Sequence, residues 1–471
     1  MLKPAFLAAA VAAALVAACG GNSSAPAAPR NVIFFLGDGM GMTTQTAARI
    51  YKVGEDGELT MDTLPESAFV KTYSNNAQVT DSAPSMAAYM TGVKMNNEVI
   101  SMSADTAAFD ATGKDYLSGA DSTCPASGNG SAVTTLLELA KKAGWGTGAV
   151  TTTRITHATP AATYAHVCHR DAENTIAAQT VPGGSGYNTA LGDGVDVLLG
   201  GGRQFFLPTA SGGKRTDGRD LTAEFGARGY TYVKNKTEFD AAPASTTKKL
   251  VGLFTNSHMS YDSDRDATVE PSLAEMTTKA IDILSKNQTG FFLMVEGGRI
   301  DHALHETTAR KALQDTVAFD DAIKAAIDKM KTLDVDLKNT LIVVTADHDH
   351  TLVLNGYAAR TGATTAASPG VLGLLKNFVN GALSLDSGGN PFTIIGFGNG
   401  ENRPASRGAL TDAQVADKTY HQEAAIPMAA GSETHGGTDV FLGAIGRGAE
   451  NFSGVITNTE VFNLIRQSVG L

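Results

Sequence analysis

The stretch VIFFLGDGMG (residues 32–41) joins an unbroken apolar run to a glycine-flanked aspartate, Asp38. Unbroken runs, as opposed to alternating ones, are typical of strands buried on both faces in a parallel sheet. Three further segments have the same character, at residues 148–151, 291–295 and 341–344. The sequence therefore predicts four buried parallel strands, each followed by a loop.

Helical segments lie between these strands. Residues 132–142 and 308–330 place apolar side chains at helical spacing on one face. Strands alternating with helices predict an α/β fold, here a three-layer sandwich with a central, mostly parallel sheet and helices on both faces. We interpret residues 30–471 as one catalytic domain, with polar or Gly-, Ala- and Ser-rich surface insertions near 204–270 and 355–430.

Composition excludes one class of partner. The chain has 48 acidic against 37 basic residues, a formal net charge of −11, and 42% hydrophobic residues. This is a globular composition. Binding to nucleic acid needs a basic face, so the sequence predicts no nucleic-acid-binding module.

The first residues have the character of a targeting signal. Lys3 precedes a run rich in Ala, Val and Leu that is too short to span a bilayer comfortably. We expect residues 1–18 to be a signal peptide and Cys19 to be lipidated, with residues 19–29 as a flexible tether. Ordinary cleavage after Ala18 is the alternative. Either way the protein is exported, to the periplasm or cell envelope, with lipidation adding a membrane anchor.

Two further cysteines, Cys124 and Cys168, complete the count of three. Export means an oxidising compartment, in which they could pair as a disulfide. Two free buried thiols are the alternative.

Candidate metal ligands follow all four predicted strands. Asp38 follows the first, residues 153–159 with His157 follow the second, Glu296 ends the third, and Asp347-His348 follow the fourth. An aspartate after one strand is often only a helix cap. Four such residues at the carboxyl ends of the strands, where α/β sheets bind ligands, indicate a shared site.

Two other segments add nitrogen ligands. Asp301 and His305 are four residues apart and share one face if the segment is helical, an arrangement that suits Zn²⁺. His435 is a lone histidine in a predicted loop and carries little weight by itself.

Ser82 is the candidate nucleophile. The residues after it have helical character, which places Ser82 at a helix N-terminus, where backbone N–H groups favour a phosphate. An ordinary helix cap is an equally good interpretation of its position alone. A serine without a neighbouring general base needs another activator, and metal coordination is one.

Taken together, these motifs resemble those of the alkaline phosphatases. The resemblance spans residues 30 to 445 in the family's order, in the segments GDGMG (37–41), TDSA (80–83), TTTRITHATPAATYAHVCHRD (151–171), LLGGGR (198–203), VEGGRIDHALHE (295–306), TADHDHT (345–351) and ETHGG (433–437). It implies hydrolysis of small phosphate monoesters by a metal-activated serine through a phosphoserine intermediate. It also implies a homodimer.

The resemblance further implies two Zn²⁺ and one Mg²⁺. The implied ligands are Asp301, His305 and His435 for the first zinc, Asp38, Asp347 and His348 with Ser82 for the second, and Asp38, Thr159 and Glu296 for magnesium. Arg170 is implied to clamp the phosphate and His302 to lie near it. Asp81 and His157 are implied to contact these groups, and His157 and His302 are similar to the residues of the animal enzymes.

Two alternatives remain open. A sulfatase or phosphodiesterase of the same superfamily would share the sheet and the metals, although the segment SAPSM (82–86) lacks the arginine that follows the modified residue in sulfatases. A non-catalytic surface lipoprotein that binds phosphate or metal is the more remote alternative.

Overall fold

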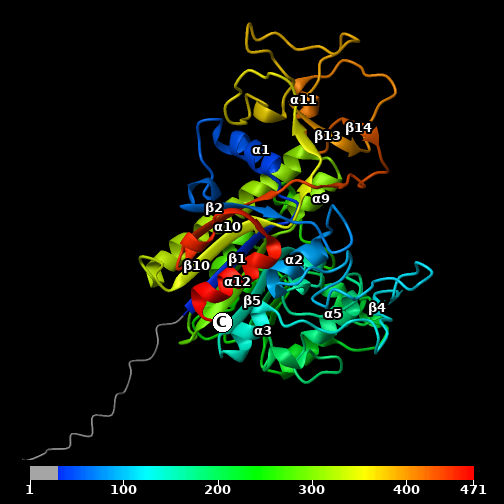
Figure 1. Ribbon diagram of the computed structural model, residues 1–471. Coiled ribbons are helices and arrows are strands. Elements are labelled where there is room, and N and C mark those ends of the chain that lie inside the picture. The colour runs from blue at the N-terminus through cyan, green and yellow to red at the C-terminus, as the bar shows by residue number, and fades with distance from the viewer. Residues whose placement is uncertain (1–29) are drawn as a thin grey trace, which may run out of the picture.

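The computed structural model describes residues 30–471 (Figure 1). The expected signal peptide, the lipidation site Cys19 and the tether lie outside the described residues. Within residues 30–471, none of the helices combines the length and the apolar character that crossing a bilayer requires.

A ten-stranded sheet forms the centre of the molecule. In spatial order its strands are β17 (Gly454–Thr457), β2 (Glu66–Lys71), β16 (Val440–Gly446), β10 (Thr340–Ala346), β1 (Arg30–Gly37), β9 (Gly290–Gly297), β5 (Gly146–Arg154), β6 (Val197–Gly201), β8 (Leu250–Leu253) and β7 (Thr231–Val233). Only β16 runs against the others, since its ladders with β10 and β2 are both antiparallel. The expected mostly parallel sheet is therefore confirmed.

The four predicted strands are β1, β5, β9 and β10, and they are neighbours in the sheet. Their side chains are buried on both faces over most of their length, which explains the unbroken apolar runs. In the register of the sheet, Gly37 at the end of β1 lies between Gly297 of β9 and Ala346 of β10. This register brings the residues after the strands to one edge.

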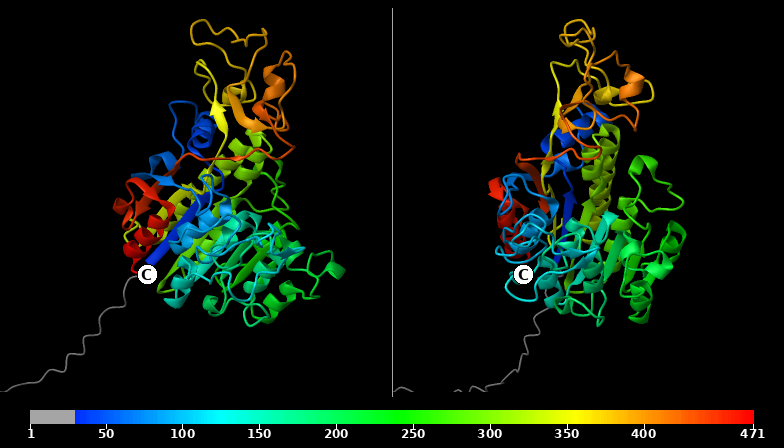
Figure 2. Two further views of the ribbon diagram at one scale, coloured as in Figure 1. Left: turned by 45° about the vertical axis from the view of Figure 1, so that its right-hand side comes forward. Right: turned by 90° about the vertical axis from the view of Figure 1, so that its right-hand side faces the viewer.

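Helices cover both faces of the sheet, as predicted (Figure 2). One face carries α1 (Met42–Val53), α8 (Leu273–Leu284), α9 (Arg299–His305) and α10 (Ala309–Leu333); the other carries α2 (Ser82–Thr91), α3 (Leu136–Lys142) and α12 (Asn458–Val469). Shorter helices lie in the connections: α4 (Ala158–Ala161), α5 (Glu173–Gln179), α6 (Leu221–Ala227), α7 (Lys236–Ala241) and α11 (Asp412–Val415).

One helix begins later than its sequence pattern suggests. The segment predicted as helical from residue 132 becomes helical only at Leu136. Thr135 accepts a hydrogen bond from the N–H of Glu138, and the Glu138 side chain accepts one from the N–H of Thr135. This capping box satisfies backbone donors that have no partner inside the helix, and so fixes where α3 starts.

The two segments expected to be insertions behave differently. Residues 204–270 contribute β7 and β8, which extend the central sheet at one edge instead of lying wholly outside it. Residues 355–430 project beyond the sheet at the top of Figure 1. There β13 (Ile395–Gly400) joins β12 (Leu352–Leu354) and β14 (Ala424–Pro427) in a separate small sheet. The remaining strands form two short pairs: β11 (Asp349–His350) with β15 (His435–Gly436), and β3 (Leu117–Ser118) with β4 (Asp121–Ser122).

Candidate active site

The predicted ligands converge at the carboxyl ends of the central strands. Asp38 follows β1, Glu296 is the penultimate residue of β9, and Asp347 and His348 follow β10; all four side chains are fully buried. Gly39 has a φ of +67°, and a Cβ there would lie 2.5 Å from the ring of His350. The glycine after Asp38 thus lets the chain pass close to the site.

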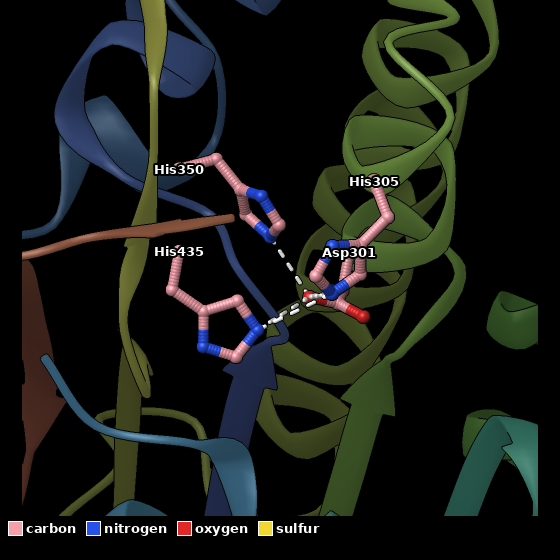
Figure 3. A group of neighbouring side chains, drawn as sticks. All are labelled: Asp301, His305, His350 and His435. Atoms are coloured by element: carbon pink, nitrogen blue, oxygen red, sulfur yellow. Dashed lines mark hydrogen bonds and ion pairs between the residues drawn. The ribbon is translucent and has the colours of Figure 1, made fainter. Parts of the chain in front are cut away.

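The first cluster of candidate ligands and their neighbours consists of Asp301, His305, His350 and His435 (Figure 3). Asp301 and His305 share one face of α9, as predicted, with Asp301 Oδ1 3.3 Å from His305 Nε2. His435 lies in β15, and its Nε2 is 3.2 Å from that of His305. His435, which stands alone in its own segment of the sequence, is therefore brought to the predicted pair of Asp301 and His305.

Hydrogen bonds fix which nitrogen of these rings faces the group. His305 Nδ1 donates to the backbone carbonyl of Glu433 at 2.5 Å, and His435 Nδ1 donates to that of Thr80 at 2.8 Å. Each ring then points the lone pair of Nε2 at the other and at Asp301. Two acceptors facing each other across 3.2 Å repel unless a cation lies between them, which is the arrangement of a metal site.

His350 was not predicted as part of the site. Its Nδ1 lies 2.5 Å from the carboxylate of Glu433 and its Nε2 lies 2.8 Å from Asp301 Oδ1. Burial lowers its pKa, but Glu433 and Asp301 outweigh that effect and raise the pKa of His350 to about 10. A ring that donates at both nitrogens has no lone pair for a metal, so His350 orients Asp301 instead. The segment TADHDHT contained a signal for His350. It lies two residues after His348 in extended chain, and side chains at that spacing point to the same side.

The second group surrounds Ser82 with Asp38, Asp347 and His348. Ser82 Oγ lies 3.3 Å from Asp38 Oδ1 and 3.2 Å from His348 Nε2. His348 Nδ1 faces the backbone carbonyl of Asp349 at 3.1 Å, so its Nε2 lone pair also faces the site. Ser82 is the first residue of α2, as predicted, but the helix cap is Asp81, which accepts from the N–H of Ala83 at 2.7 Å. The Ser82 hydroxyl is thus free of a capping role.

The third group contains Asp38, Glu296 and His157, with Thr159 beside Asp38. Thr159 donates to Asp38 Oδ2 at 3.4 Å, and Thr153 donates to Glu296 Oε2 at 3.2 Å. Three buried atoms around these groups have no hydrogen-bond partner: Glu296 Oε1, Asp347 Oδ2 and His157 Nδ1.

The electrostatics of the site call for cations. Burial and the neighbouring Asp38 raise the pKa of Asp347 to about 8, and they raise the pKa of Glu296 well above its usual range. Without a cation, carboxylates this close inside a protein cannot all stay ionised. Unpartnered carboxylate oxygens and converging imidazole lone pairs are the donor set of bound divalent metals, so the residues present fit the metals that the sequence predicts.

Arg170 connects the segment around Ser82 to the third group. Its guanidinium lies 3.1 Å from Asp81 and 3.1 Å from His157 Nε2. Its backbone N–H donates to the backbone carbonyl of Glu98. Burial and the nearby Asp81 raise the pKa of the Glu98 side chain to about 7. Arg170 is therefore held beside Asp81, the residue before Ser82, and by His157 on its other side.

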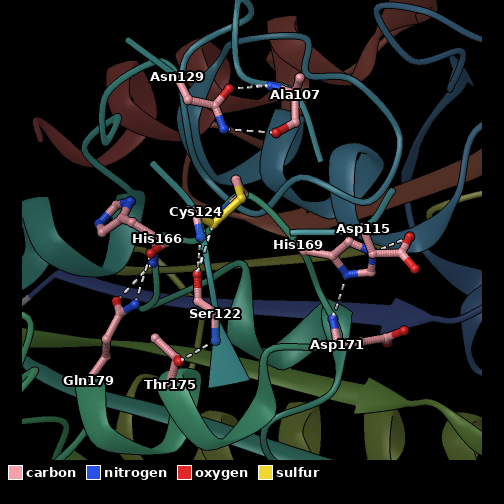
Figure 4. The surroundings of a disulfide bond; sticks show 11 residues. Ala107, Asp115, Ser122, Cys124, Asn129, His166, His169, Asp171, Thr175 and Gln179 are labelled. Atoms are coloured by element: carbon pink, nitrogen blue, oxygen red, sulfur yellow. Dashed lines mark hydrogen bonds and ion pairs between the residues drawn. A yellow bond between two sulfur atoms is a disulfide. The ribbon is translucent and has the colours of Figure 1, made fainter. Parts of the chain in front are cut away.

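A disulfide lies two residues before Arg170. Cys124 and Cys168 are paired, as expected, with their Cα atoms 6.0 Å apart (Figure 4). The next residue after Cys168, His169, lies 3.5 Å from Asp115 and accepts from the backbone N–H of Asp171 at 3.2 Å. These contacts tie the segment that carries Arg170 to the loop around Cys124.

His302 lies beside His157, and their ring centroids are 5.4 Å apart. Two neighbours were missed at the sequence level. His258 packs against His302 with ring centroids 4.2 Å apart, and Arg299 donates to His302 Nδ1 at 2.8 Å. His258 comes from the segment interpreted as an insertion, and no motif pointed to it.

Comparison with known proteins places these residues in context. The alkaline phosphatase family model matches residues 29–471. An alkaline phosphatase of Gadus morhua is 38% identical over 456 residues, covering 90% of this chain and 88% of that protein. A membrane-bound alkaline phosphatase of Bombyx mori is 36% identical over 480 residues, covering 94% of this chain and 80% of that one. The crystal structure of Thermus thermophilus alkaline phosphatase superposes with a TM-score of 0.66 at 26% identity, covering 94% of this chain and 92% of that one.

Removing metals should make stability strongly dependent on pH. In the metal-free protein, burial and Asp38 raise the pKa of Asp347 from its ordinary 3.8 to about 8. The stability that this carboxyl contributes is therefore fully present below about pH 4 and is lost as the pH rises through 8. Metals bind the deprotonated ligands more tightly as pH rises. We therefore expect the difference in melting temperature between zinc- and magnesium-loaded and chelator-treated protein to widen from about pH 6 to about pH 9.

Scanning calorimetry checks this, with Asp320→Asn as the control. Asp320 is a buried carboxylate that accepts backbone N–H groups of residues 60 and 61, outside the site. Asp347→Asn should shrink the metal-dependent difference, whereas Asp320→Asn should shift both forms equally. Equal shrinkage in the two variants would contradict a metal role for Asp347.

Loss of the disulfide should loosen Arg170 as well as lower stability. The double variant Cys124→Ala/Cys168→Ala should reduce the free energy of unfolding by about 2–4 kcal/mol. It should also weaken binding of inorganic phosphate, measured by calorimetry. Ser122→Ala is the control, because the Ser122 hydroxyl contacts Cys124 Sγ at 2.8 Å while the disulfide stays intact. A loss of stability with unchanged phosphate binding would refute the link to Arg170.

Proposed function

The chain belongs to the alkaline phosphatase family, and from that premise we propose that it hydrolyses phosphate monoesters with Ser82 as the nucleophile, through a phosphoserine intermediate. The chain is a metal-binding hydrolase of the alkaline phosphatase type. Family membership does not favour the phosphodiesterase, sulfatase or non-catalytic alternatives.

The position of the Ser82 hydroxyl carries this proposal. Its Oγ is buried beside Asp38 and His348, both expected metal ligands, at the start of α2. The backbone N–H groups of the first helical turn have no partner within the helix and favour an anion there. A phosphoryl group bound at this helix start would present its phosphorus to the hydroxyl.

Arg170 would provide a second set of contacts to the phosphate. A guanidinium offers parallel N–H groups that match two oxygens of a phosphoryl group. Asp81 keeps Arg170 next to Ser82 and caps α2, so one carboxylate positions both the helix start and the clamp. His302, whose ring lies 5.4 Å from that of His157, would lie near the bound phosphate.

We assign three metals to the three ligand groups. Asp301, His305 and His435 would hold one Zn²⁺, Asp38, Asp347 and His348 a second, and Asp38, Thr159 and Glu296, near His157, a Mg²⁺. Nitrogen and carboxylate ligands suit zinc, and an all-oxygen set suits magnesium. When bound, such ions lower the pKa of a coordinated hydroxyl and stabilise charge on a leaving oxygen.

We further propose an exported homodimer, anchored through lipid on Cys19. Exposed apolar side chains in the projecting segment 355–430 support contact with a second copy; Tyr357, Phe378 and Val379 are 84%, 68% and 77% exposed. A membrane-bound relative is in keeping with export.

Substituting Ser82 tests the mechanism. Ser82→Ala should lower turnover of p-nitrophenyl phosphate by at least ~10³-fold while leaving the metal content unchanged. Acid-quenched wild-type protein should carry phosphate on the peptide that contains Ser82, detected by mass spectrometry. Ser85→Ala is the matched control: Ser85 lies one turn further along α2 and donates to the backbone of Asp347.

Full activity in the Ser82→Ala variant would rule out the mechanism. Comparison of a monoester, a diester and a sulfate ester in the same assay tests the substrate class. A higher kcat/KM for the diester or the sulfate ester would contradict the assignment as a monoesterase.

A further inference from the structure

The edge of the central sheet opposite the candidate site is rich in basic side chains. The adjacent strands from β10 through β1, β9, β5, β6 and β8 to β7 run parallel, so their first residues meet at one edge, which we call the amino edge. Basic residues outnumber acidic ones there, although the whole chain has a formal net charge of −11. The charged residues at the first position of each strand and the four positions before it are Arg30, Lys142, Asp193, Asp196, Arg228, Lys248, Lys249, Lys286, Asp336 and Lys338.

The acidic residues of the amino edge are all matched by lysines. Asp193 and Asp196 lie 2.8 and 2.9 Å from the ammonium of Lys141. Asp336 lies 2.8 Å from that of Lys338. Four exposed basic side chains have no carboxylate partner among residues 30–471, and they leave a net positive field at this edge. They are Lys142, Arg228, Lys248 and Lys286.

A cavity of about 610 Å³ lies among these lysines. Its lining includes Lys248 and Lys286, the indole of Trp145 and the aliphatic side chain of Leu284. Lys286 Nζ donates to the backbone carbonyl of Thr247 at 2.8 Å, which holds the ammonium in place. Trp145 and Leu284 are buried and form an apolar wall. Cations beside an apolar wall suit an anion that is attached to an apolar group.

The chain that precedes the described residues joins the molecule at the amino edge. Arg30 begins β1, and its backbone N–H donates to the carbonyl of Thr289, two residues after Asn287 in the cavity lining. This end of the sheet lies near the C-terminus in the lower part of Figure 1. Residues 19–29 can span at most about 40 Å even when fully extended. A lipid on Cys19 would therefore keep the amino edge close to the bilayer.

The candidate active site lies at the other edge of the same sheet. β1 has 8 residues and β5 has 9, so at about 3.3 Å per residue the two edges are roughly 25–30 Å apart. If the amino edge contacts a membrane, the candidate metal ligands face away from it, toward soluble substrates. An anion at the amino edge is thus distinct from a phosphate at Ser82.

We propose that the amino edge binds anionic phospholipid headgroups, with one headgroup phosphate in the cavity beside Lys248 and Lys286. The inference rests on the lipid anchor of the proposed function, because the anchor brings the bilayer within reach. Basic side chains near a membrane surface are attracted to anionic lipids over about a Debye length. The anchor and the amino edge would together fix the orientation of the enzyme on the membrane.

Vesicle binding tests the amino edge in the absence of the anchor. The exported chain with Cys19→Ser carries no lipid, and mass spectrometry checks its mature N-terminus. It should sediment with vesicles of phosphatidylglycerol and phosphatidylcholine, less so at high salt, and should not bind vesicles of phosphatidylcholine alone. Lys142→Glu/Lys248→Glu should weaken binding at least ~10-fold, because each reversed charge replaces attraction with repulsion.

The matched control is Lys234→Glu/Lys376→Glu, which changes the total charge by the same amount. Lys234 follows the carboxyl end of β7, and Lys376 lies in the projecting segment 355–430. The control pair should leave vesicle binding unchanged. Both pairs should leave turnover of p-nitrophenyl phosphate unchanged, since neither alters the candidate active site.

Trp145 reports directly on the cavity, because it is the only tryptophan of the chain. In the Cys19→Ser protein, a phospholipid that carries a nitroxide on its headgroup should quench the fluorescence of Trp145. Lys142→Glu/Lys248→Glu should abolish this quenching. An equal response of Trp145 to inorganic phosphate would overturn the proposal, since the cavity would then be a site for a soluble anion.

Other outcomes separate the amino edge from the anchor. Equal binding to anionic and neutral vesicles, or binding unaffected by Lys142→Glu/Lys248→Glu, would overturn the proposal. A lipidated wild-type protein whose Cys19→Ser form does not bind anionic vesicles would also overturn it and leave the anchor standing. Anionic-vesicle binding by Cys19→Ser, combined with an unlipidated wild-type N-terminus, would support the amino edge and contradict the anchor alone.

Discussion

Mutual repulsion among buried carboxylates is the constraint on which the rest of the site depends. β1 lies between β9 and β10, so Asp38, Glu296 and Asp347 leave the sheet side by side with no solvent to separate their charges. The fold holds them there because the three strands are fixed by their apolar side chains and ladder hydrogen bonds. Such an arrangement is costly unless cations compensate it, which makes the sheet a scaffold for metals. Asp38 is shared by two ligand groups, and it therefore links Ser82 to the group around Glu296.

Histidine tautomers divide the site into two chemically distinct halves. Around Asp301 and Ser82, backbone carbonyls accept from Nδ1 and turn lone pairs inward. Around His157 and His302, arginines take the lone pairs and leave N–H donors. The surrounding hydrogen bonds thus decide whether a histidine of the site presents a lone pair or an N–H donor. Arg170 lies where the halves meet.

The sequence was most informative where local pattern and final geometry coincide. Unbroken apolar runs gave the four central strands, and the i,i+4 spacing of Asp301 and His305 gave a shared helix face. His435 could be assigned to the site only from the pairing of β15 with β11, and no local sequence pattern predicts that pairing. His258 could not be identified as a neighbour of His302, because their contact depends on how a long excursion returns to the sheet edge. Arg299 lies three residues before His302 on α9, so that contact is local. The start of α3 was missed because the Thr135–Glu138 capping box, and not the apolar periodicity, sets it.

The central claim is that the ligand groups hold metal ions while the neighbouring cluster of His157, His258 and His302 (the three-histidine cluster) does not. Anomalous X-ray diffraction at the zinc absorption edge tests it most directly on crystals of the zinc- and magnesium-loaded protein. The account predicts one strong peak among Asp301, His305 and His435, and another among Asp38, Asp347 and His348. The space between His157, His258 and His302 should show none. A zinc peak within the three-histidine cluster, or none at the two ligand groups, would contradict it.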